Sequence, residues 1–142
     1  MKLAIINRKA RFDYEFLETY VAGICLFGSE VKSIRDSRVS MIDAFCFFIN
    51  GELWLKGLNV TPGLNSFQHD PVRDRKLLLK RRELKKIESK LDSGLTIIPV
   101  KLFASDRNII KVEIALARGK KSYDKRNAIK ERDIKREMKN EF

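Results

Sequence analysis

The side chains of this chain that could do chemistry are mostly cations, and they are concentrated in two stretches. Residues 69–90 carry nine Lys or Arg against four Asp or Glu, and residues 117–142 carry ten against five. Residues 1–68 and 91–116 are nearly neutral. Clustered Lys and Arg attract phosphate groups and release counterions when they bind a nucleic acid. The net charge of +11 therefore predicts two contact regions for a polyanion rather than a general basic bias.

Residues suited to enzymatic or metal chemistry are few and scattered. His69 is the only histidine, so catalysis that uses an imidazole would have to pass through it. Cys25 and Cys46 do not form a CxxC motif, and both lie in apolar runs where a buried thiol is an ordinary core residue. The carboxylates mostly adjoin basic residues and form no convincing metal cluster. We therefore expect no enzyme, no metal site and no cofactor.

The length and hydropathy of the chain favour one domain with an appendage. The 142 residues are enough to bury one hydrophobic core. The longest apolar run, Ala44–Ile49, is far too short to span a bilayer. Residues 2–6 lack the length of a signal-peptide core. We expect a cytoplasmic monomer that makes no membrane contact.

A long strand followed by a short helix is expected in the first part of the chain. Tyr14–Phe27 has the pattern of a strand with a bend or bulge at Gly23. Residues 28–35 indicate a helix with Ser29 as its N-cap and Glu30 close to the positive end of the helix dipole. Two apolar residues of this helix should face inward and two cations outward: Val31 and Ile34, and Lys32 and Arg35.

Two hairpins and a second helix are predicted after it. Residues 44–49 and 52–55 flank an Asn-Gly pair, which favours a type I′ turn. Residues 100–116 alternate around a turn at 105–108, and Pro99 marks a strand edge or bulge. Between the hairpins, a helical stretch should open at Asp70-Pro71 and end near Ser93-Gly94. Its apolar stripe would consist of Leu77, Leu84, Ile87 and Leu91.

These elements predict a mainly β fold in which residues 1–116 form a small closed antiparallel barrel with two inserted helices. An OB-like barrel fits, and an SH3-like barrel or an open sheet fits nearly as well. Residues 117–142 contain few apolar side chains, so they cannot offset the entropy cost of ordering their backbone. This basic tail should be disordered in the free protein and become helical on a bound polyanion.

Three functional classes are compatible with such a chain. A structural ribosomal protein is also small and basic, and would remain on ribosomal subunits at stoichiometric level through high-salt washing. A nuclease would need a carboxylate cluster or a His/Lys acid–base pair, neither of which is convincing here. A non-catalytic nucleic-acid-binding protein needs only the two basic regions, and the composition favours this class.

Several short motifs occur in an order that resembles one family. They cover residues 7–10, 28–35, 50–55, 69–79, 117–121, 124–126 and 129–133. None is decisive alone, but the ordered set is highly specific. On these motifs the chain resembles the SmpB family, the SsrA-binding proteins that partner transfer-messenger RNA in bacteria. It departs from the family at Lys80, where His is usual, and in its short tail.

The resemblance implies a function in ribosome rescue. An OB-like barrel would bind the tRNA-like domain of transfer-messenger RNA and replace the missing anticodon arm on ribosomes stalled without a stop codon. The tail would lie as a helix in the decoding centre and the empty message channel, against small-subunit RNA. The nascent chain would then be tagged and the ribosome released. Alanyl-tRNA synthetase and elongation factor Tu would be partners through the shared RNA.

Most of the expected site residues lie in the matched motifs, and the others lie in the basic tail. We expect contacts with transfer-messenger RNA from Asn7, Arg8, Lys9, Glu30, Lys32, Arg35, His69, Arg73, Arg75, Lys76, Arg118, Lys120 and Lys121. We expect contacts of the tail with the ribosome and its decoding centre from Tyr123, Asp124, Lys125, Arg126, Ile129, Lys130, Arg132, Lys135, Arg136 and Met138.

Some of these residues also have purely structural readings. Glu30 could cap its helix as well as accept a hydrogen bond from a base or ribose. His69 could hold a structural hydrogen bond at a helix start. The aromatic side chains next to the first hairpin are more typical of a core than of a base-stacking platform; they are Phe45, Phe47, Phe48 and Trp54. Tyr123, in the unfolded basic segment, is better suited to stacking on a nucleotide.

Overall fold

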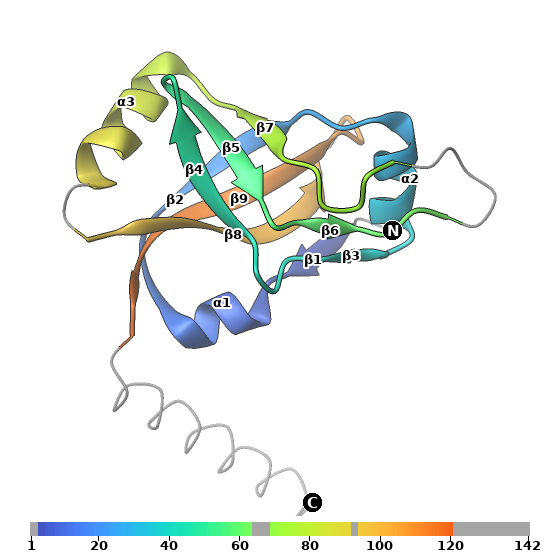
Figure 1. The fold of residues 1–142 in the computed structure, drawn as a ribbon, viewed down its shortest axis with the longest axis horizontal. Helices are drawn as coiled ribbons and strands as arrows, with labels where there is room; N and C mark the ends of the chain where they lie inside the picture. The colour runs from blue at the N-terminus through green and yellow to red at the C-terminus, as the bar shows by residue number, and fades with distance from the viewer. Residues whose placement is uncertain (1–2, 64–68, 92–93, 121–142) are drawn as a thin grey trace, which may run out of the picture.

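The fold consists mainly of β-strands (Figure 1). The computed structural model describes residues 3–63, 69–91 and 94–120. Within these residues the elements, in chain order, are β1 (Ala4–Ile6), α1 (Arg8–Asp13), β2 (Tyr14–Ile24), α2 (Gly28–Arg35), β3 (Val39–Ser40), β4 (Phe45–Ile49), β5 (Glu52–Lys56), β6 (Asn59–Val60), β7 (Arg75–Leu78), α3 (Arg81–Lys90), β8 (Thr96–Ala104) and β9 (Ile110–Gly119).

The strands pair antiparallel throughout. The larger sheet has the order β1-β8-β4-β5-β7-β2-β9, and an additional pairing joins β8 to β9. With that pairing, each of the strands β8, β4, β5, β7, β2 and β9 has a neighbour on both sides. The short strands β3 and β6 form a separate two-stranded sheet. Among the residues described, no helix is long and apolar enough to cross a membrane.

Both predicted hairpins are confirmed. In the first, β4 pairs with β5, and the turn residues Asn50 and Gly51 have φ angles of 51° and 79°. Positive φ at both central positions is what a type I′ turn requires. In the second, β8 pairs with β9, and the register shifts between Pro99 and Lys101. The shift confirms the predicted irregularity at Pro99, which has no N–H to give to the ladder.

The long strand differs from its prediction in two details. β2 ends at Ile24, and its register shift lies between Phe16 and Glu18 instead of at Gly23. Gly23 pairs regularly, and a Cβ built on it would lie only 3.3 Å from the Cβ of Leu78. Its missing side chain therefore permits the close approach of β7 rather than a bulge. At the other end of the chain, β9 continues past Leu116 to Gly119.

The helix over residues 28–35 is confirmed as α2, but its cap is different. Ile34 is fully buried, Val31 packs against the core, and the side chains of Lys32 and Arg35 are exposed. The N-cap is Phe27, with no side-chain cap hydrogen bond. The Ser29 hydroxyl instead lies 2.9 Å from His69 Nδ1. Ser29 lies inside the helix because the chain turns helical one residue earlier, at Gly28.

The predicted helical stretch from Asp70 to Gly94 is wrong in its first half. Residues 70–74 form a turn in which Asp70 Oδ1 accepts from the Val72 N–H, and the strand β7 follows. β7 pairs with both β5 and β2, so two distant strands determine its conformation. Only the second half is helical, as α3, where Leu84, Ile87 and Leu91 face the core as expected. The short helix α1 was not predicted.

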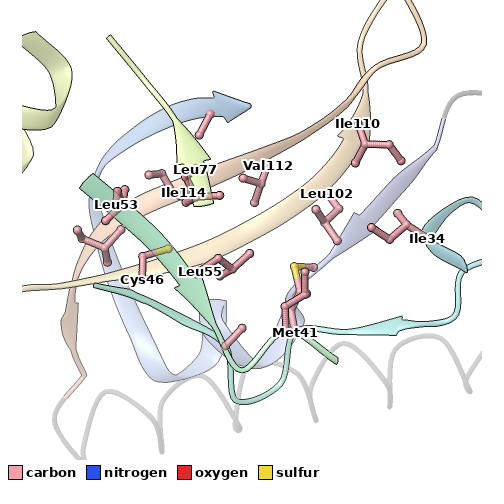
Figure 2. Packing of buried hydrophobic residues seen from close by; sticks show 14 of the residues in the cluster. Ile34, Met41, Cys46, Leu53, Leu55, Leu77, Leu102, Ile110, Val112 and Ile114 are labelled. Carbon is pink, nitrogen blue, oxygen red and sulfur yellow. The ribbon is translucent and has the colours of Figure 1, made fainter. Parts of the chain in front are cut away.

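The core lies between the strands of the large sheet (Figure 2). Figure 2 shows Leu53 and Leu55 of β5 directed toward the side chains of Leu102, Val112 and Ile114 on β8 and β9. A second cluster of buried residues lies on the side of α1 and includes Ala10, Ile98 and Ala115. Cys46 is a core residue, as predicted. Cys25 is exposed because β2 has already ended before it.

Candidate nucleic-acid interface

A buried ion pair joins α2 to β7. Neither the Glu30 nor the Arg75 side chain has any exposed surface. Arg75 Nε donates to Glu30 Oε2 at 2.7 Å, and Arg75 Nη1 donates to the carbonyl oxygens of Leu58 and Arg73 at 2.8 and 2.9 Å. Arg75 Nη2 donates to the Pro71 carbonyl at 3.2 Å. Each nitrogen of the guanidinium therefore has a partner, which a buried charge requires.

The second oxygen of the Glu30 carboxylate accepts hydrogen bonds from residues at the protein surface. Glu30 Oε1 accepts from Arg73 Nη2 at 2.5 Å and from the Phe27 N–H at 2.8 Å. Arg73 also donates to the Cys25 carbonyl at 3.1 Å. One buried carboxylate thus connects the start of α2 with the loop before β7 and with the end of β2.

These contacts determine the ionisation of the pair. Burial acts to raise the pKa of Glu30, but the hydrogen bonds from Arg73 and Phe27 and the charge of Arg75 outweigh it, so the pKa lies below its ordinary value. Burial lowers the pKa of Arg75, and the neighbouring Glu30 carboxylate opposes that shift. Arginine remains charged at any physiological pH, so the pair is ionic.

His69 connects α2 to β6. Its Nε2 lies 2.8 Å from the Val60 carbonyl oxygen and its Nδ1 lies 2.9 Å from the Ser29 hydroxyl. A carbonyl oxygen only accepts, so Nε2 carries the proton and, in the neutral ring, Nδ1 accepts from Ser29. His69 is buried. Its structural role matches the ordinary reading of this residue, although it lies before a turn and not before a helix.

The cations near this ion pair that reach solvent lie on α2 and on the loop before β7. Lys32 is exposed, and Arg35 donates to Asn108 Oδ1 and to the Asn108 carbonyl, which connects α2 with the β8–β9 turn. Arg73 is partly exposed beside them. Lys76 faces the outside of β7, 3.1 Å from Glu52 in a half-exposed ion pair at the first hairpin. Lys32 and Arg35 thus lie on α2, Arg73 lies against Glu30 and Phe27 at the start of that helix, and Lys76 lies beside the first hairpin.

A second basic group lies around α1, away from α2 in Figure 1. Arg8 and Lys9 are exposed on α1, and Lys9 lies 4.0 Å from Asp43. Arg118 is exposed near the end of β9. Lys120 Nζ donates to the Arg11 carbonyl of α1 at 3.0 Å. The structure therefore brings the predicted N-terminal and C-terminal cations together at one end of the molecule.

Asn7, at the start of α1, has an internal role. Its Oδ1 accepts from the Ala10 N–H at 3.2 Å as the helix N-cap, and its Nδ2 donates to the Pro99 and Met41 carbonyls. The side chain is buried. Its polar atoms are thus used inside the protein, as are those of Glu30 and Arg75.

The remaining predicted residues cannot be placed. Lys121 and every predicted contact of the tail lie outside the described residues: Tyr123, Asp124, Lys125, Arg126, Ile129, Lys130, Arg132, Lys135, Arg136 and Met138. Within the described part of the chain, no group of three or more His, Cys, Asp or Glu side chains is arranged to hold a metal ion.

Sequence reasoning missed one surface feature. Phe27 is 54% exposed, and the Arg73 guanidinium carbon lies 4.1 Å from the centroid of its ring. The apolar pattern of residues 14–27 predicts that Phe27 is the last residue of a strand. The glycine that follows it, Gly28, is a sequence signal that the strand ends here. The aromatic residues of the first hairpin differ in exposure. Phe48 packs on the core as expected, whereas Phe45 is 41% exposed.

Comparisons with known proteins agree on one family. The family model described as SmpB protein matches residues 4–142. The SsrA-binding protein of Cytophaga hutchinsonii is 54% identical over 138 residues, covering 94% of this chain and 90% of that protein. The SsrA-binding protein of Pseudothermotoga lettingae is 51% identical over 142 residues, covering 98% and 95%. A solved structure described as "tmRNA-SmpB: a journey to the center of the bacterial ribosome" matches with a TM-score of 0.73 and 44% identity, covering 89% of this chain and 94% of the other.

Proposed function

The chain belongs to the SmpB family, and we propose that it is an RNA-binding adaptor of trans-translation. It binds the tRNA-like domain of transfer-messenger RNA and delivers that RNA to ribosomes that have stalled without a stop codon. The observation that carries this proposal is the match of the family model over residues 4–142, which includes both the folded part and the basic tail. The relatives named SsrA-binding protein support the same RNA partner.

We assign the two parts of the chain different tasks. Residues 1–116, with the last residues of β9, act as a closed OB-like barrel that carries the RNA. The continuous ring of strand pairings supports a closed barrel, since closure removes exposed edges. The residues that follow β9 act as a tail that is disordered when free and helical in the decoding centre and the empty message channel. The ribosome then changes template, the nascent chain is tagged, and the subunits are released.

The predicted RNA-binding residues divide into contacting and positioning residues. Lys32 and Arg35 on α2 are exposed cations that can reach phosphate, and Arg73 is a partly exposed one beside them on the loop before β7. A second group lies around α1, where Arg8, Lys9 and Arg118 are exposed and Lys120 is partly exposed. Lys76, on β7, is a separate, partly exposed cation. Four residues act from inside the protein by holding these surfaces in place: Asn7, Glu30, His69 and Arg75. We propose that Lys121 and the predicted tail residues make the remaining contacts.

The partners follow from the RNA. Transfer-messenger RNA and the ribosome, including small-subunit RNA, bind the protein directly. Alanyl-tRNA synthetase and elongation factor Tu act on the same RNA and are partners through it. The protein works in the cytoplasm as a monomer without a cofactor, and it contributes binding and placement rather than a catalysed reaction.

A reconstituted tagging reaction tests this function. Ribosomes stalled on a message that lacks a stop codon are incubated with charged transfer-messenger RNA from the same genome, elongation factor Tu and the full-length protein. Addition of the tag to the nascent chain is expected only when the protein is present. A reaction that proceeds equally well without the protein would contradict the proposal. Incubation of the protein with RNA and Mg²⁺ alone should leave the RNA intact.

A further inference from the structure

Phe27 presents an aromatic ring at a cationic surface. It lies between the end of β2 at Ile24 and the start of α2 at Gly28, and 54% of its surface is exposed. Single exposed apolar residues are common on protein surfaces, but an exposed aromatic ring next to cations is a feature of nucleic-acid-binding sites. Arg73 lies against the ring, and Lys32 and Arg35 are exposed on α2, the helix that begins directly after Phe27. An aromatic side chain surrounded by such cations is typical of sites that bind single-stranded nucleic acid.

The ring is held in place before any ligand arrives. Its own N–H donates to Glu30 Oε1 at 2.8 Å, so the backbone of Phe27 is anchored to the buried carboxylate. The Arg73 guanidinium lies over the ring at 4.1 Å, and Arg73 is itself held by Glu30 and by the Cys25 carbonyl. One face of the ring is thus covered by a fixed cation, while 54% of the surface of Phe27 remains exposed. A rigid platform binds with a smaller entropy cost than a flexible one.

The residue after the ring adds no bulk of its own. Gly28 has no side chain and is exposed. Val72, from the loop that carries Arg73, is 53% exposed and adds apolar surface. Lys32 and Arg35 follow along the same helix. The surface therefore combines a flat apolar ring, backed by Arg73, with two further cations on the helix that begins beside it.

We infer that Phe27, backed by Arg73, is a stacking platform for one unpaired base of the bound RNA. The inference rests on the proposed function and adds a contact that none of the predicted cations provides. A base offers a π-face that stacks on the ring, while its flanking phosphates face Lys32 and Arg35. Because every base has such a face, the contact adds affinity for unpaired nucleotides without selecting one base.

The test compares Phe27→Leu with the unchanged full-length protein in binding to transfer-messenger RNA. Leu keeps the apolar contact and removes the ring. We expect RNA affinity to fall by about 5-fold or more, within the range known for loss of one stacked base. The slope of log affinity against log salt should stay the same, since no phosphate contact is lost. Phe103→Leu is the matched control, because Phe103 on β8 also has a cation over its ring, Lys101 at 5.2 Å from the centroid, and neither residue belongs to the predicted RNA contacts.

Two further measurements separate stacking from its alternatives. In a protein with Phe27→Trp and Trp54→Phe, the one remaining tryptophan reports on the platform, and RNA should quench its fluorescence. Trp54 is suitable for replacement because its buried Nε1 has no hydrogen-bond partner among the described residues. Heparin is a polyanion without bases, so its affinity should not change in Phe27→Leu.

The outcomes are distinguishable. Failure of the unchanged protein to bind transfer-messenger RNA would overturn the proposed function itself. Normal RNA binding by Phe27→Leu, together with unquenched fluorescence of the protein that carries Phe27→Trp and Trp54→Phe, would overturn only the platform. An equal loss of RNA and heparin binding would also overturn it, because it would show that the substitution disturbs the cations. Preferential binding of an acidic peptide over RNA would assign the ring to a protein partner instead.

Discussion

Arg75 Nε lies 2.7 Å from Glu30 Oε2, and neither side chain has any exposed surface. A buried ion pair is costly to desolvate, so it persists where its geometry is good and its remaining groups are bonded. Here the backbone carbonyls of Leu58, Pro71 and Arg73 complete the shell of Arg75. The pair therefore contributes less as a source of stability than as a fixed connection beneath Phe27 and Arg73.

Removing the carboxylate should destabilise the fold strongly. Glu30→Gln leaves Arg75 as a buried charge without its counter-ion, and such losses cost about 3–5 kcal/mol of unfolding free energy. Urea denaturation followed by circular dichroism measures the change. The matched control is Glu52→Gln, which breaks the half-exposed pair with Lys76 and should cost less than about 1 kcal/mol. Equal effects of the two substitutions would show that Glu30 is not a buried partner.

Acid should weaken the same connection. The pKa of Glu30 is lower in the folded protein than in the unfolded chain, where it is about 4.3. The folded state therefore binds this proton less readily, so the contribution of Glu30 is complete above about pH 4.3 and is lost as the pH falls through the folded value. Carboxyl-detected NMR should show Glu30 titrating below the exposed glutamates. A titration at or above their pH would contradict the geometry.

Local chemistry explains which elements could be predicted. The turn at Asn50 and Gly51 needs positive φ at both residues, and the dipeptide Asn-Gly is the one that most often adopts this conformation. α2 follows from its own apolar spacing at Val31 and Ile34. In contrast, β7 is a short apolar run whose pattern does not distinguish strand from helix, and its pairing with β2 and β5 decides the outcome.

The candidate site was predictable in its residues but not in its geometry. The family motifs identified Glu30, Arg73 and Arg75, yet Glu30 and Arg75 are 45 positions apart and meet only in the fold. Nothing in a single sequence shows that their charges cancel in the interior. Phe27 was missed because its meaning depends on the placement of Arg73, which lies on a loop.

The exposed cation Lys32 should contact phosphate. Lys32→Ala is expected to weaken binding of transfer-messenger RNA and to reduce the salt slope by about 1, because one fewer counterion is released. Lys56→Ala is the control, since Lys56 is exposed on β5 outside the predicted surface. Electrophoretic mobility shifts at several salt concentrations give both quantities. An unchanged slope would remove Lys32 from the interface.

Deletion of the tail should separate RNA binding from tagging. The cut belongs after Lys120, because its N–H donates to the Asp13 carbonyl at 2.9 Å and its side chain holds Arg11. Residues 1–120 should keep most of the affinity for transfer-messenger RNA and lose the ability to support tagging on stalled ribosomes. A shortened protein that folds by circular dichroism but no longer binds the RNA would contradict the division into barrel and tail.

The two cysteines should react differently. Cys25 is exposed, whereas Cys46 is buried in the core, and burial raises the pKa of its thiol. A thiol reacts as the thiolate, so both lower access and a higher pKa protect Cys46. Mass spectrometry after brief maleimide treatment of the native protein should find label on Cys25 alone, and on both residues after denaturation. Native labelling of Cys46 would contradict the packing of β4 against β8.

Sequencing of the RNA that co-purifies with the tagged full-length protein is the decisive measurement of its function. The protein is purified from its own cells in parallel with a variant that carries Lys32→Ala and Arg35→Ala. We predict one dominant small RNA that has an alanine-type acceptor arm and an internal reading frame, at a clearly lower level with the variant. Ribosomal RNA alone, at stoichiometric level and equal in both preparations, would contradict the proposed function and indicate a structural ribosomal protein.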